Sequence, residues 1–596
     1  MRRFASFLVM RGLVAAAILI FAPGNLAAQD KPKMNVILIS LDQLRADRVH
    51  CLGNPRPTTP NLDRLAEQGV RFSHFYTVAP WTAPSYSTLM TSLFPSRHGV
   101  TLFWRPGDPL IDSNVPMLAE IFKAWGYHTA AFVNNGVAGK ALTGRGFDEY
   151  DQGQPNGQVK DITQRGGEGY NLAPETTEKL LPWLEQHRAQ PFFLFVLFLE
   201  PHSPYNPPPQ DDIFKTSAYP NETNTGYDLQ RGHLFRLAML GDQQAVERLY
   251  DLYDGKIHFV DRYVGQLMDQ VEKLGLGDNT LIVVTSDHGE LLYSHPGDFL
   301  TFDHRSLYDA VIHIPMIMAG PGLPKGKRVD AMASNIDTAP TILNLAGIAP
   351  PKDAAGQSLL PLIEGKVAAA NKYIYAEEDV VVPLRSVRTE RYKLIENLYT
   401  GKVQLFDLQS DPNEQHDIAG QAAGIQADLQ SHLQSWMAEN HATQADRLPA
   451  WQRVAAYARA HETVTDDQTV GGRMLLTGGG WHDDESAASA NHDGGCFWTE
   501  GGDGSKTALW RPDDPLVGKY QVYVYYGHPS AGKVATNARF TIEADHQAKS
   551  AKVDFSRGAG NWKLLGTCRN PHDVVLTNAA NGAVIADAVK FVRVGN

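Results

Sequence analysis

Between residues 34 and about 347, short runs of Val, Ile, Leu and Phe alternate with amphipathic stretches, and this alternation constrains the fold most. The runs contain no polar alternation, which is typical of parallel strands that are buried on both faces. They cover residues 36–41, 129–133, 192–199 and 281–285, and the helical stretches include residues 60–68, 115–125 and 249–273. The pattern predicts an α/β domain with a doubly wound, mostly parallel sheet.

The composition of the sequence and the spacing of its apolar runs change after about residue 447. Residues 448–470 form a polar stretch that we interpret as a linker, and from residue 471 onward Gly and turn residues separate short alternating runs. Such spacing is typical of a small all-β sandwich. We therefore expect a catalytic domain over residues 34–447 and a C-terminal sandwich over residues 471–596.

The N-terminus carries the only strongly hydrophobic segment. Arg2, Arg3 and Arg11 precede an apolar run of about ten residues, which is too short to cross about 30 Å of hydrocarbon. Residues 1–28 are therefore predicted to be a signal peptide, the alternative being an uncleaved anchor that starts near Phe4. This predicts an exported protein, periplasmic or secreted, with no transmembrane anchor after cleavage. In that oxidising compartment Cys496 and Cys568 could pair, and Cys51 would stay free.

Composition excludes several classes of function. With 54 Lys and Arg against 66 Asp and Glu, the formal net charge is −12 and there is no basic stripe, which argues against nucleic acid as a partner. Three cysteines cannot build a disulfide framework or a cysteine-rich zinc site.

Polar side chains follow all four predicted strands. These are Asp42-Gln43, Asn134-Asn135, Glu200-Pro201-His202 and Asp287-His288-Gly289. In open α/β sheets ligands bind beyond the carboxyl ends of the strands, so we expect these groups to meet at one rim. Asp42, Asp287 and His288 would offer two oxygens and one nitrogen to a metal ion that keeps open positions. A carboxylate after a strand can also be a simple helix cap.

The candidate nucleophile is Thr82, which precedes Ala83-Pro84 and a predicted helix over residues 85–94. We expect Thr82 at the N-cap, where free backbone N–H groups favour an anion. Coordination to the metal would ionise the hydroxyl and make it a nucleophile, whereas without a metal Thr82 is an ordinary capping residue.

Several ordered motifs resemble the sulfatase family, within the alkaline phosphatase superfamily, up to about residue 420. They include Asp42, the turn from Thr82 to Ser85 with residues 95–99, His202-Ser203-Pro204-Tyr205, residues 285–290, and Asp411-Pro412-Asn413-Glu414. The resemblance implies the alkaline phosphatase type of α/β fold and an ester hydrolase.

The sequence departs from that family at the nucleophile. Sulfatases carry Cys-x-Pro-x-Arg or Ser-x-Pro-x-Arg, whose first residue is oxidised to formylglycine, and here Thr82 and Tyr86 occupy the two ends. Their Gly-Lys-Trp-His aligns with residues 133–136, and their Asp-Asn metal pair with Asp287-His288. A threonine has one hydroxyl, so a threonine sulfate could not collapse as a formylglycine sulfate does, whereas water or an alcohol can attack a phosphothreonine at phosphorus.

The site pattern also resembles phosphoethanolamine and lipoteichoic-acid transferases, which use a metal-bound threonine and two substrate histidines. That resemblance implies Asp42, Thr82, Asp287 and His288 as metal ligands, with His202 and His304 holding the anion or protonating the leaving oxygen. At least one divalent ion is implied; zinc or manganese is favoured, and calcium or magnesium is also compatible.

From these features we expect a metal-dependent hydrolase or transferase of anionic esters on a glycan or a lipid. The loss of the motif Arg and Lys removes two positive charges, which favours a singly charged ester such as a phosphodiester, although phosphate and phosphonate esters fit the same chemistry. The alternatives are a sulfatase acting on a sulfated polysaccharide and a glycan-binding protein without catalysis.

The C-terminal region resembles the golvesin C-terminal, xanthan-lyase-associated sandwich. Its motifs are Trp510-Arg511-Pro512, residues 518–526, Gly560-Asn561-Trp562 and residues 586–589. Four tryptophans, at 481, 498, 510 and 562, lie in this region. They are interpreted either as exposed sugar-binding faces or as the core of a small domain.

Overall fold

The structure is a computed structural model, and it describes most of the chain beyond residue 32. The described residues are 33–101, 111–152, 172–219, 233–295, 304–379, 383–398, 400–446, 463–465, 474–484, 496–512, 516, 518–527, 532–544 and 547–595. The predicted signal peptide lies outside them, so export stays a prediction. No helix in these ranges is both long and apolar enough to cross a membrane.

An eight-stranded sheet forms the centre of the N-terminal domain, in the order β5-β4-β6-β1-β7-β8-β2-β9. Only β8 runs against its neighbours. The strands are β1 (Asn35–Leu41), β2 (Val70–Phe72), β4 (His128–Val133), β5 (Glu149–Asp151), β6 (Phe192–Phe198), β7 (Thr280–Thr285), β8 (Met316–Ala319) and β9 (Lys327–Val329). The doubly wound, mostly parallel sheet is therefore confirmed.

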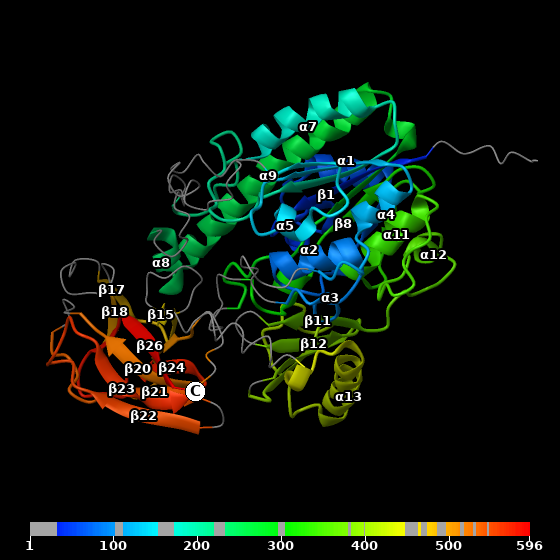
Figure 1. The fold of residues 1–596 in the computed structure, drawn as a ribbon. Coiled ribbons are helices and arrows are strands. Elements are labelled where there is room, and N and C mark those ends of the chain that lie inside the picture. Colours follow the sequence, from blue (N-terminus) through cyan, green and yellow to red (C-terminus); the bar gives the residue numbers. More distant parts are fainter. Residues whose placement is uncertain are drawn as a thin grey trace, which may run out of the picture. The chain divides into compact units, whose positions relative to one another are not determined.

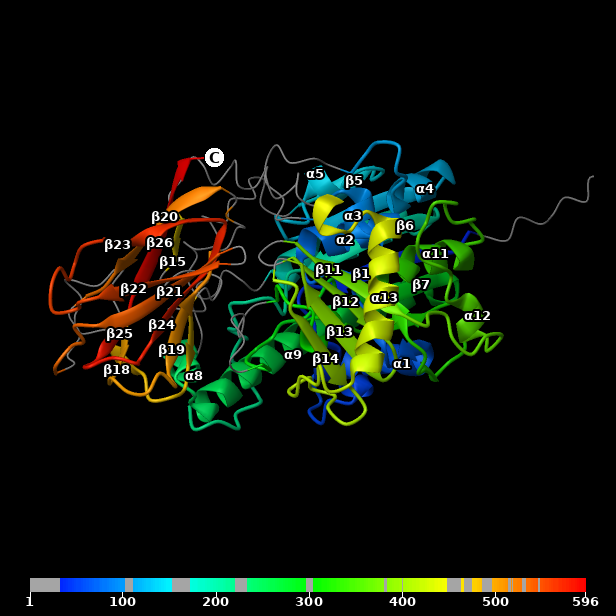
Figure 2. The ribbon, with the colours of Figure 1, turned by 90° about the horizontal axis from the view of Figure 1, so that it is seen from below.

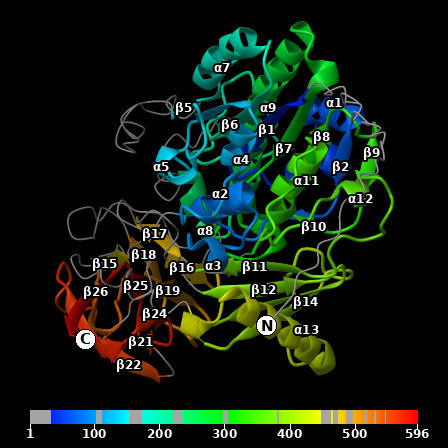
Figure 3. The ribbon, with the colours of Figure 1, turned by 45° about the vertical axis from the view of Figure 1, so that its right-hand side comes forward.

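Helices cover both faces of this sheet (Figures 1 and 3). One face packs on α1 (Pro60–Gln68), α7 (Ala173–His187), α8 (His233–Met239) and α9 (Gln243–Lys273); the other packs on α2 (Thr82–Thr91), α4 (Leu118–Ala124), α5 (Lys140–Thr143), α11 (Thr338–Leu345) and α12 (Leu360–Ile363). Alternate residues of β1 enter the two cores: Ile37 and Ile39 one, Val36 and Leu38 the other. This two-sided burial explains why the central strands are mostly apolar on both faces.

The predicted elements agree closely with the observed ones, and the differences have local causes. Strand ends match within one residue, and α1 has the predicted bounds. Helix α4 begins at Leu118 and not at residue 115, since Pro116 disfavours helical backbone at the residue before it. Helix α9 begins six residues early because the Asp242 side chain accepts hydrogen bonds from Gln244 N and Ala245 N.

A second, antiparallel sheet lies in the C-terminal part of the same domain. It consists of β11 (Ile374–Glu378), β12 (Leu384–Arg388), β13 (Tyr392–Asn397) and β14 (Val403–Asp407), and α13 (Ala423–Asn440) packs against it (Figure 2). The sequence analysis did not separate this sheet from the larger one. Short elements complete the domain: β3 (Phe75–Tyr76), β10 (Ala333–Ser334), α3 (Pro95–His98) and α10 (Asp309–Ile312), with 3-10 turns at Ala46–Arg48, His50–Leu52, Gly277–Asn279 and Asn335–Asp337.

The C-terminal region is all β, as predicted. One sheet contains β15 (Thr463–Thr465), β20 (Lys519–Tyr525), β23 (Lys563–Arg569) and β26 (Ala588–Gly595). A second contains β16 (Met474–Thr477), β19 (Thr507–Trp510), β21 (Ala538–Ala544), β22 (Gln547–Val553) and β24 (Pro571–Thr577), and a third β17 (His482–Asp484), β18 (Cys496–Thr499) and β25 (Val584–Ala586). Strand β15 lies within the residues that the sequence analysis assigned to the linker, and it pairs with β26.

The side chains of this sandwich bear on two predictions from the sequence. Trp481 and Trp510 belong to its hydrophobic core, as the second interpretation expects. Trp498 and Trp562 are partly exposed, and sugar binding by them stays a prediction. The pairing that the sequence allowed between Cys496 and Cys568 is absent: the two residues lie on strands of different sheets, and no disulfide joins them.

Candidate active site

Two carboxylates meet at the carboxyl edge of the large sheet. Strands β1 and β7 are parallel neighbours, with Ser40 opposite Thr285, so Asp42 and Asp287 emerge side by side just beyond the two strands. Both side chains are buried. Gln43 adopts left-handed backbone (φ 63°), and its N–H donates to Asp287 Oδ1 at 3.2 Å. The turn after β1 therefore holds the two carboxylates against each other.

His288 adds a nitrogen to this pair. Its Nδ1 lies 2.9 Å from the carbonyl oxygen of Gly289 and must donate to it, so Nε2 carries the lone pair. Nε2 lies 3.3 Å from Asp287 Oδ2 and 3.3 Å from Thr82 Oγ1. Burial lowers the pKa of His288 to about 4, so this imidazole is neutral at pH 7.

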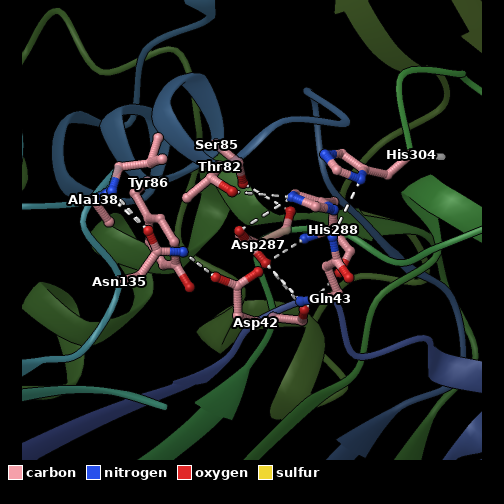
Figure 4. Close-up of polar contacts among 12 residues, drawn as sticks. Asp42, Gln43, Thr82, Ser85, Tyr86, Asn135, Ala138, Asp287, His288 and His304 are labelled. Atoms are coloured by element: carbon pink, nitrogen blue, oxygen red, sulfur yellow. Dashed lines mark hydrogen bonds and ion pairs between the residues drawn. The ribbon is translucent and has the colours of Figure 1, made fainter. Parts of the chain in front are cut away.

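The four predicted metal ligands are thus brought together. Figure 4 shows Asp42, Asp287, His288 and Thr82 facing one space. Thr82 is the first residue of α2 and Trp81 is its N-cap, so the expected position of Thr82 is wrong by one residue. The cause is Trp81, whose extended backbone (φ −136°, ψ 142°) makes it the residue that precedes the first helical turn. From the first position of α2, the Thr82 hydroxyl lies 3.3 Å from His288 Nε2.

The donor set fits a divalent cation. Among the described residues, Asp42 Oδ1, Asp287 Oδ2 and Gln43 Oε1 are buried oxygens with no hydrogen-bond partner. Burial raises the pKa of Asp42 well above its ordinary value, and the neighbouring Asp287 raises it further. A bound cation would remove this cost, because it would pair with both carboxylates. Oxygen donors with one imidazole suit manganese, zinc, calcium or magnesium to different degrees.

His304 stands beside these ligands in a stack of rings. Its imidazole lies between the rings of Trp81 (4.6 Å between centroids) and His288 (4.3 Å). Its Nδ1 lies 3.2 Å from Gln43 Nε2, which donates to it, and 3.6 Å from Glu290 Oε2. With Nδ1 accepting from Gln43, the proton of a neutral His304 sits on Nε2.

His202 follows β6, and its link to the site is electrostatic. Its Nδ1 lies 2.7 Å from the carbonyl oxygen of Ser203. Burial is the main cause that lowers its pKa to about 4; the hydrogen bond with the Ser203 carbonyl opposes this shift, and the neighbouring His304 and His288 act in the same direction as burial. His202 therefore lies close enough to His304 and His288 to interact with them electrostatically, and it is neutral at pH 7.

Comparison with known proteins identifies the family of the N-terminal domain. The profile of the sulfatase family matches residues 34–348, more than half of the chain. The chain belongs to the sulfatase family. A profile for the C-terminal part of N-sulphoglucosamine sulphohydrolase matches residues 297–442, and one for the golvesin C-terminal domain matches residues 463–593. The protein is thus an ester hydrolase of the alkaline phosphatase superfamily, and sulfatases use a divalent metal ion.

Similar proteins are mainly sulfatases. A Delta 4,5-hexuronate-2-O-sulfatase from Bacteroides thetaiotaomicron is 27% identical over 424 residues, which cover 66% of this chain and 86% of that protein. A solved structure in complex with its substrate D-glucosamine-2-N,6-O-disulfate aligns with a TM-score of 0.58 at 22% identity, covering 70% of this chain and 99% of that one. A phosphonate monoester hydrolase of Agrobacterium radiobacter aligns with a TM-score of 0.56 at 22% identity, covering 68% and 96%. At such identity the two structures establish the shared fold.

Two positions at which this sulfatase-family chain departs from the usual motifs have structural roles. Asn135 donates a very short hydrogen bond from Nδ2 to Asp42 Oδ2, and its Oδ1 accepts from Val137 N at 2.8 Å. Tyr86 is buried and shares a hydrogen bond of 2.9 Å with Ser40 Oγ. Asn135 therefore orients a metal-site carboxylate, while Tyr86 faces the sheet.

Sequence reasoning missed three further residues of this sulfatase-family site. Trp81 and Glu290 position His304, and Ser85 donates to the carbonyl oxygen of Asp287 at 2.8 Å. Ser85 and Glu290 lie within motifs named in the sequence analysis but were given no role there, and Trp81 directly precedes Thr82. Adjacency to those motifs was the available signal.

Proposed function

We propose that this sulfatase-family protein is a metal-dependent hydrolase of anionic esters in which Thr82 is the nucleophile, and that its ester is a singly charged phosphorus ester. One observation carries the proposal: Thr82 Oγ1 lies at the start of α2, 3.3 Å from His288 Nε2 and beside two buried carboxylates. The α2 N-terminus adds backbone N–H groups that favour an anion.

Asp42, Thr82, Asp287 and His288 would hold the cation, and Gln43 Oε1 is a further available donor. A divalent ion bound there supplies Lewis acidity, which lowers the pKa of the threonine hydroxyl and offsets the charge of the ester. Zinc or manganese is favoured for this donor set, and calcium or magnesium is also compatible.

The reaction then proceeds by two successive displacements at phosphorus, in which the protein residues have separate roles. Thr82 Oγ attacks phosphorus in line with the leaving oxygen, forming an O–P bond while the bond to the leaving alcohol breaks. The Thr82 hydroxyl proton passes to solvent, and His304 acts as an imidazolium beside Glu290: its Nε2 gives a proton to the leaving oxygen and the ring becomes neutral, while His202 holds the anionic group. Water then attacks phosphorus and gives one proton to His304 Nε2; the Thr82 O–P bond breaks, and the Thr82 oxygen takes a proton from solvent to restore the hydroxyl.

A sulfatase acting on a sulfated glycan is the second candidate, and the comparisons favour it. The first relative is named a hexuronate sulfatase, and the substrate in one aligned structure is a disulfated glucosamine. The chemistry of Thr82 is what favours phosphorus: without a second hydroxyl, release of sulfate would require attack of water on sulfur. The export signal and a glycan- or lipid-linked substrate remain part of the proposal.

A panel of p-nitrophenyl sulfate, phosphate, phosphodiester and phosphonate, assayed with defined metals, separates the two candidates. Preference for the phosphodiester or phosphonate supports the proposal, and a preference for sulfate of more than about tenfold, or 1.4 kcal/mol, contradicts it. Brief reaction with ³²P- or ³⁵S-labelled esters, followed by acid quench, identifies the element on Thr82. Hydrolysis that survives Thr82→Ala would exclude Thr82 as nucleophile.

A further inference from the structure

Two hydroxyls in the first turn of α2 contact the segment that carries His288. Thr82 Oγ1 lies 3.3 Å from His288 Nε2, and Ser85 Oγ donates to the carbonyl oxygen of Asp287 at 2.8 Å. Thr82 and Ser85 are three positions apart in the helix, so their side chains lie on the same face. Figure 4 shows both pointing toward Asp287 and His288. The Ser85 hydrogen bond therefore fixes where the first turn of α2 meets the residues proposed to bind the metal.

The Ser85 hydroxyl belongs to a buried polar group that takes no part in the two displacements. Asn335 Nδ2 donates to Ser85 Oγ at 3.1 Å and to Thr77 Oγ1 at 3.0 Å. The two hydroxyl oxygens are 3.0 Å apart, and all three side chains are buried. Thr77 directly follows β3 and Asn335 directly follows β10, and these two strands are parallel neighbours. We call Thr77, Ser85 and Asn335 the Asn335 network.

The Asn335 amide determines the direction of the Ser85 hydrogen bond. The N–H of Val78 donates to Asn335 Oδ1 at 3.1 Å, so the amide oxygen faces Val78 and the Nδ2 group faces the two hydroxyls. Because Nδ2 only donates, Ser85 Oγ accepts from it, and the single Ser85 proton is directed to the carbonyl oxygen of Asp287. An ionised aspartate at position 335 would accept that proton instead.

We propose that Asn335 is a positioning residue for the Thr82 nucleophile: through Ser85 it holds the first turn of α2 against Asp287 and His288. The inference rests on the proposed function, since it requires Thr82 to attack the ester. A displacement of about 1 Å in a reacting group can lower a rate about 100-fold. At the other end of α2, Ser92 Oγ donates to the carbonyl oxygen of Ile336 at 2.7 Å, so the helix stays anchored when the Asn335 network is broken.

Steady-state kinetics of Ser85→Ala and Asn335→Ala test the proposal, on whichever p-nitrophenyl ester of the panel is hydrolysed fastest. In both variants kcat should fall about 10- to 100-fold while KM stays within about threefold, because the geometry of attack changes and substrate binding does not. Ser87→Ala is the matched control. Ser87 is equally buried in α2, and its hydroxyl donates to the carbonyl oxygen of Ala83 in the same helix at 2.8 Å. Its kcat should stay within about threefold of the wild type.

Two further measurements separate positioning from packing. Asn335→Asp keeps the shape of the side chain but loses the Nδ2 donors, so its kcat should fall as far as that of Asn335→Ala; a packing role alone would leave it near the wild type. In the metal-free protein, backbone amides at the start of α2 should exchange hydrogen faster in Ser85→Ala than in Ser87→Ala. If the variants of Asn335 fail to fold, Ser85→Ala, which removes a single oxygen atom, carries the test.

Thr82→Ala in the same assay shows which proposal fails. If Thr82→Ala abolishes turnover and Ser85→Ala keeps the kcat of Ser87→Ala, the positioning role is wrong and the proposed function stands. Losses in Ser85→Ala that are confined to KM or to Tm would overturn the positioning role as well. Turnover that survives Thr82→Ala would overturn the proposed function and this inference together.

Discussion

At the scale of single residues, the metal site depends on how the Asp42 carboxylate is oriented. Asn135 donates to Asp42 Oδ2 and is itself fixed by the N–H of Val137. Since groups that orient ligands typically change metal affinity about 10- to 100-fold, Asn135→Ala should weaken metal binding by that factor. Metal titration of the stripped protein, with kcat/KM measured at saturating metal, checks this.

Asn134→Ala is the matched control for that variant. The neighbouring amide donates to Thr176 Oγ1 at 3.0 Å and accepts from Leu199 N at 2.7 Å, so it binds α7 and the end of β6 rather than Asp42. Its loss should lower stability and leave metal affinity within about threefold of the wild type. Equal losses of affinity in both variants would mean that Asn135 has no specific role.

Tyr86 occupies the position of the usual motif arginine, yet its surroundings exclude the same role. Its ring packs on Phe195 and its hydroxyl bonds to Ser40, beneath α2. Tyr86→Phe should therefore cost about 1 kcal/mol of stability and change kcat/KM by less than about threefold. Chemical denaturation and steady-state kinetics measure the two effects, and a large drop in kcat with unchanged stability would show that Tyr86 contacts the substrate.

The sequence predicted the group of side chains proposed to bind a metal, but not the rings around it. Asp42, Asp287 and His288 were predictable because the ends of adjacent parallel strands meet at one edge. The stack of Trp81 on His304 was not, since it joins residues more than 200 positions apart whose contact depends on loop geometry. The position of Thr82 within α2 was predicted to within one residue.

At the scale of elements, the contact between α1 and α9 depends on a buried carboxylate. Asp261 in α9 accepts hydrogen bonds from Asn61 N at 2.8 Å and Leu62 N at 2.9 Å, at the start of α1. Thr59, the N-cap of α1, makes no side-chain capping bond, so Asp261 replaces it. Burial raises the pKa of Asp261 from 3.8 to about 6 even though these N–H groups lower it.

This raised pKa predicts the direction of a pH effect. The native state binds the Asp261 proton more tightly than the unfolded chain does, so the contribution of this group to stability falls as pH rises from about 4 to about 6 and is constant above. Between about pH 4.5 and 7.5, the wild type should lose about 2 kcal/mol relative to Asp261→Asn. Urea unfolding across that range measures the difference. Asp278→Asn, at an exposed site, should show no such trend, and a parallel pH dependence of Asp261→Asn and wild type would refute the assignment.

The elements that could be predicted from the sequence are those buried on both faces. The strands of the large sheet are continuous apolar runs, and their bounds followed directly. Strands β13 and β14 are only partly buried and carry Lys393, Glu396 and Gln404, so they lack that signal. In β13 the Lys393 ammonium is nonetheless buried against Asp309 and Glu414, an ion-pair arrangement that no local pattern predicts.

At the scale of the whole molecule, a net charge of −12 opposes the approach of an anionic substrate. Burial lowers the pKa of both His202 and His288 to about 4, so neither ring is charged at pH 7. In the proposed site, attraction would come from the bound cation and the N-terminus of α2, which act over a short range, while repulsion acts over the whole surface.

This balance predicts a salt dependence that separates large substrates from small ones. For a polyanionic glycan or lipid-linked ester, kcat/KM should rise about two- to fivefold as sodium chloride increases from about 20 to 200 mM, because screening weakens the long-range repulsion. For a singly charged p-nitrophenyl ester the change should be smaller, since only one charge approaches the surface. Choline chloride in place of sodium chloride controls for specific effects of sodium. A fall in kcat/KM for the polyanion under the same conditions would instead require a positively charged surface that guides the substrate to Thr82.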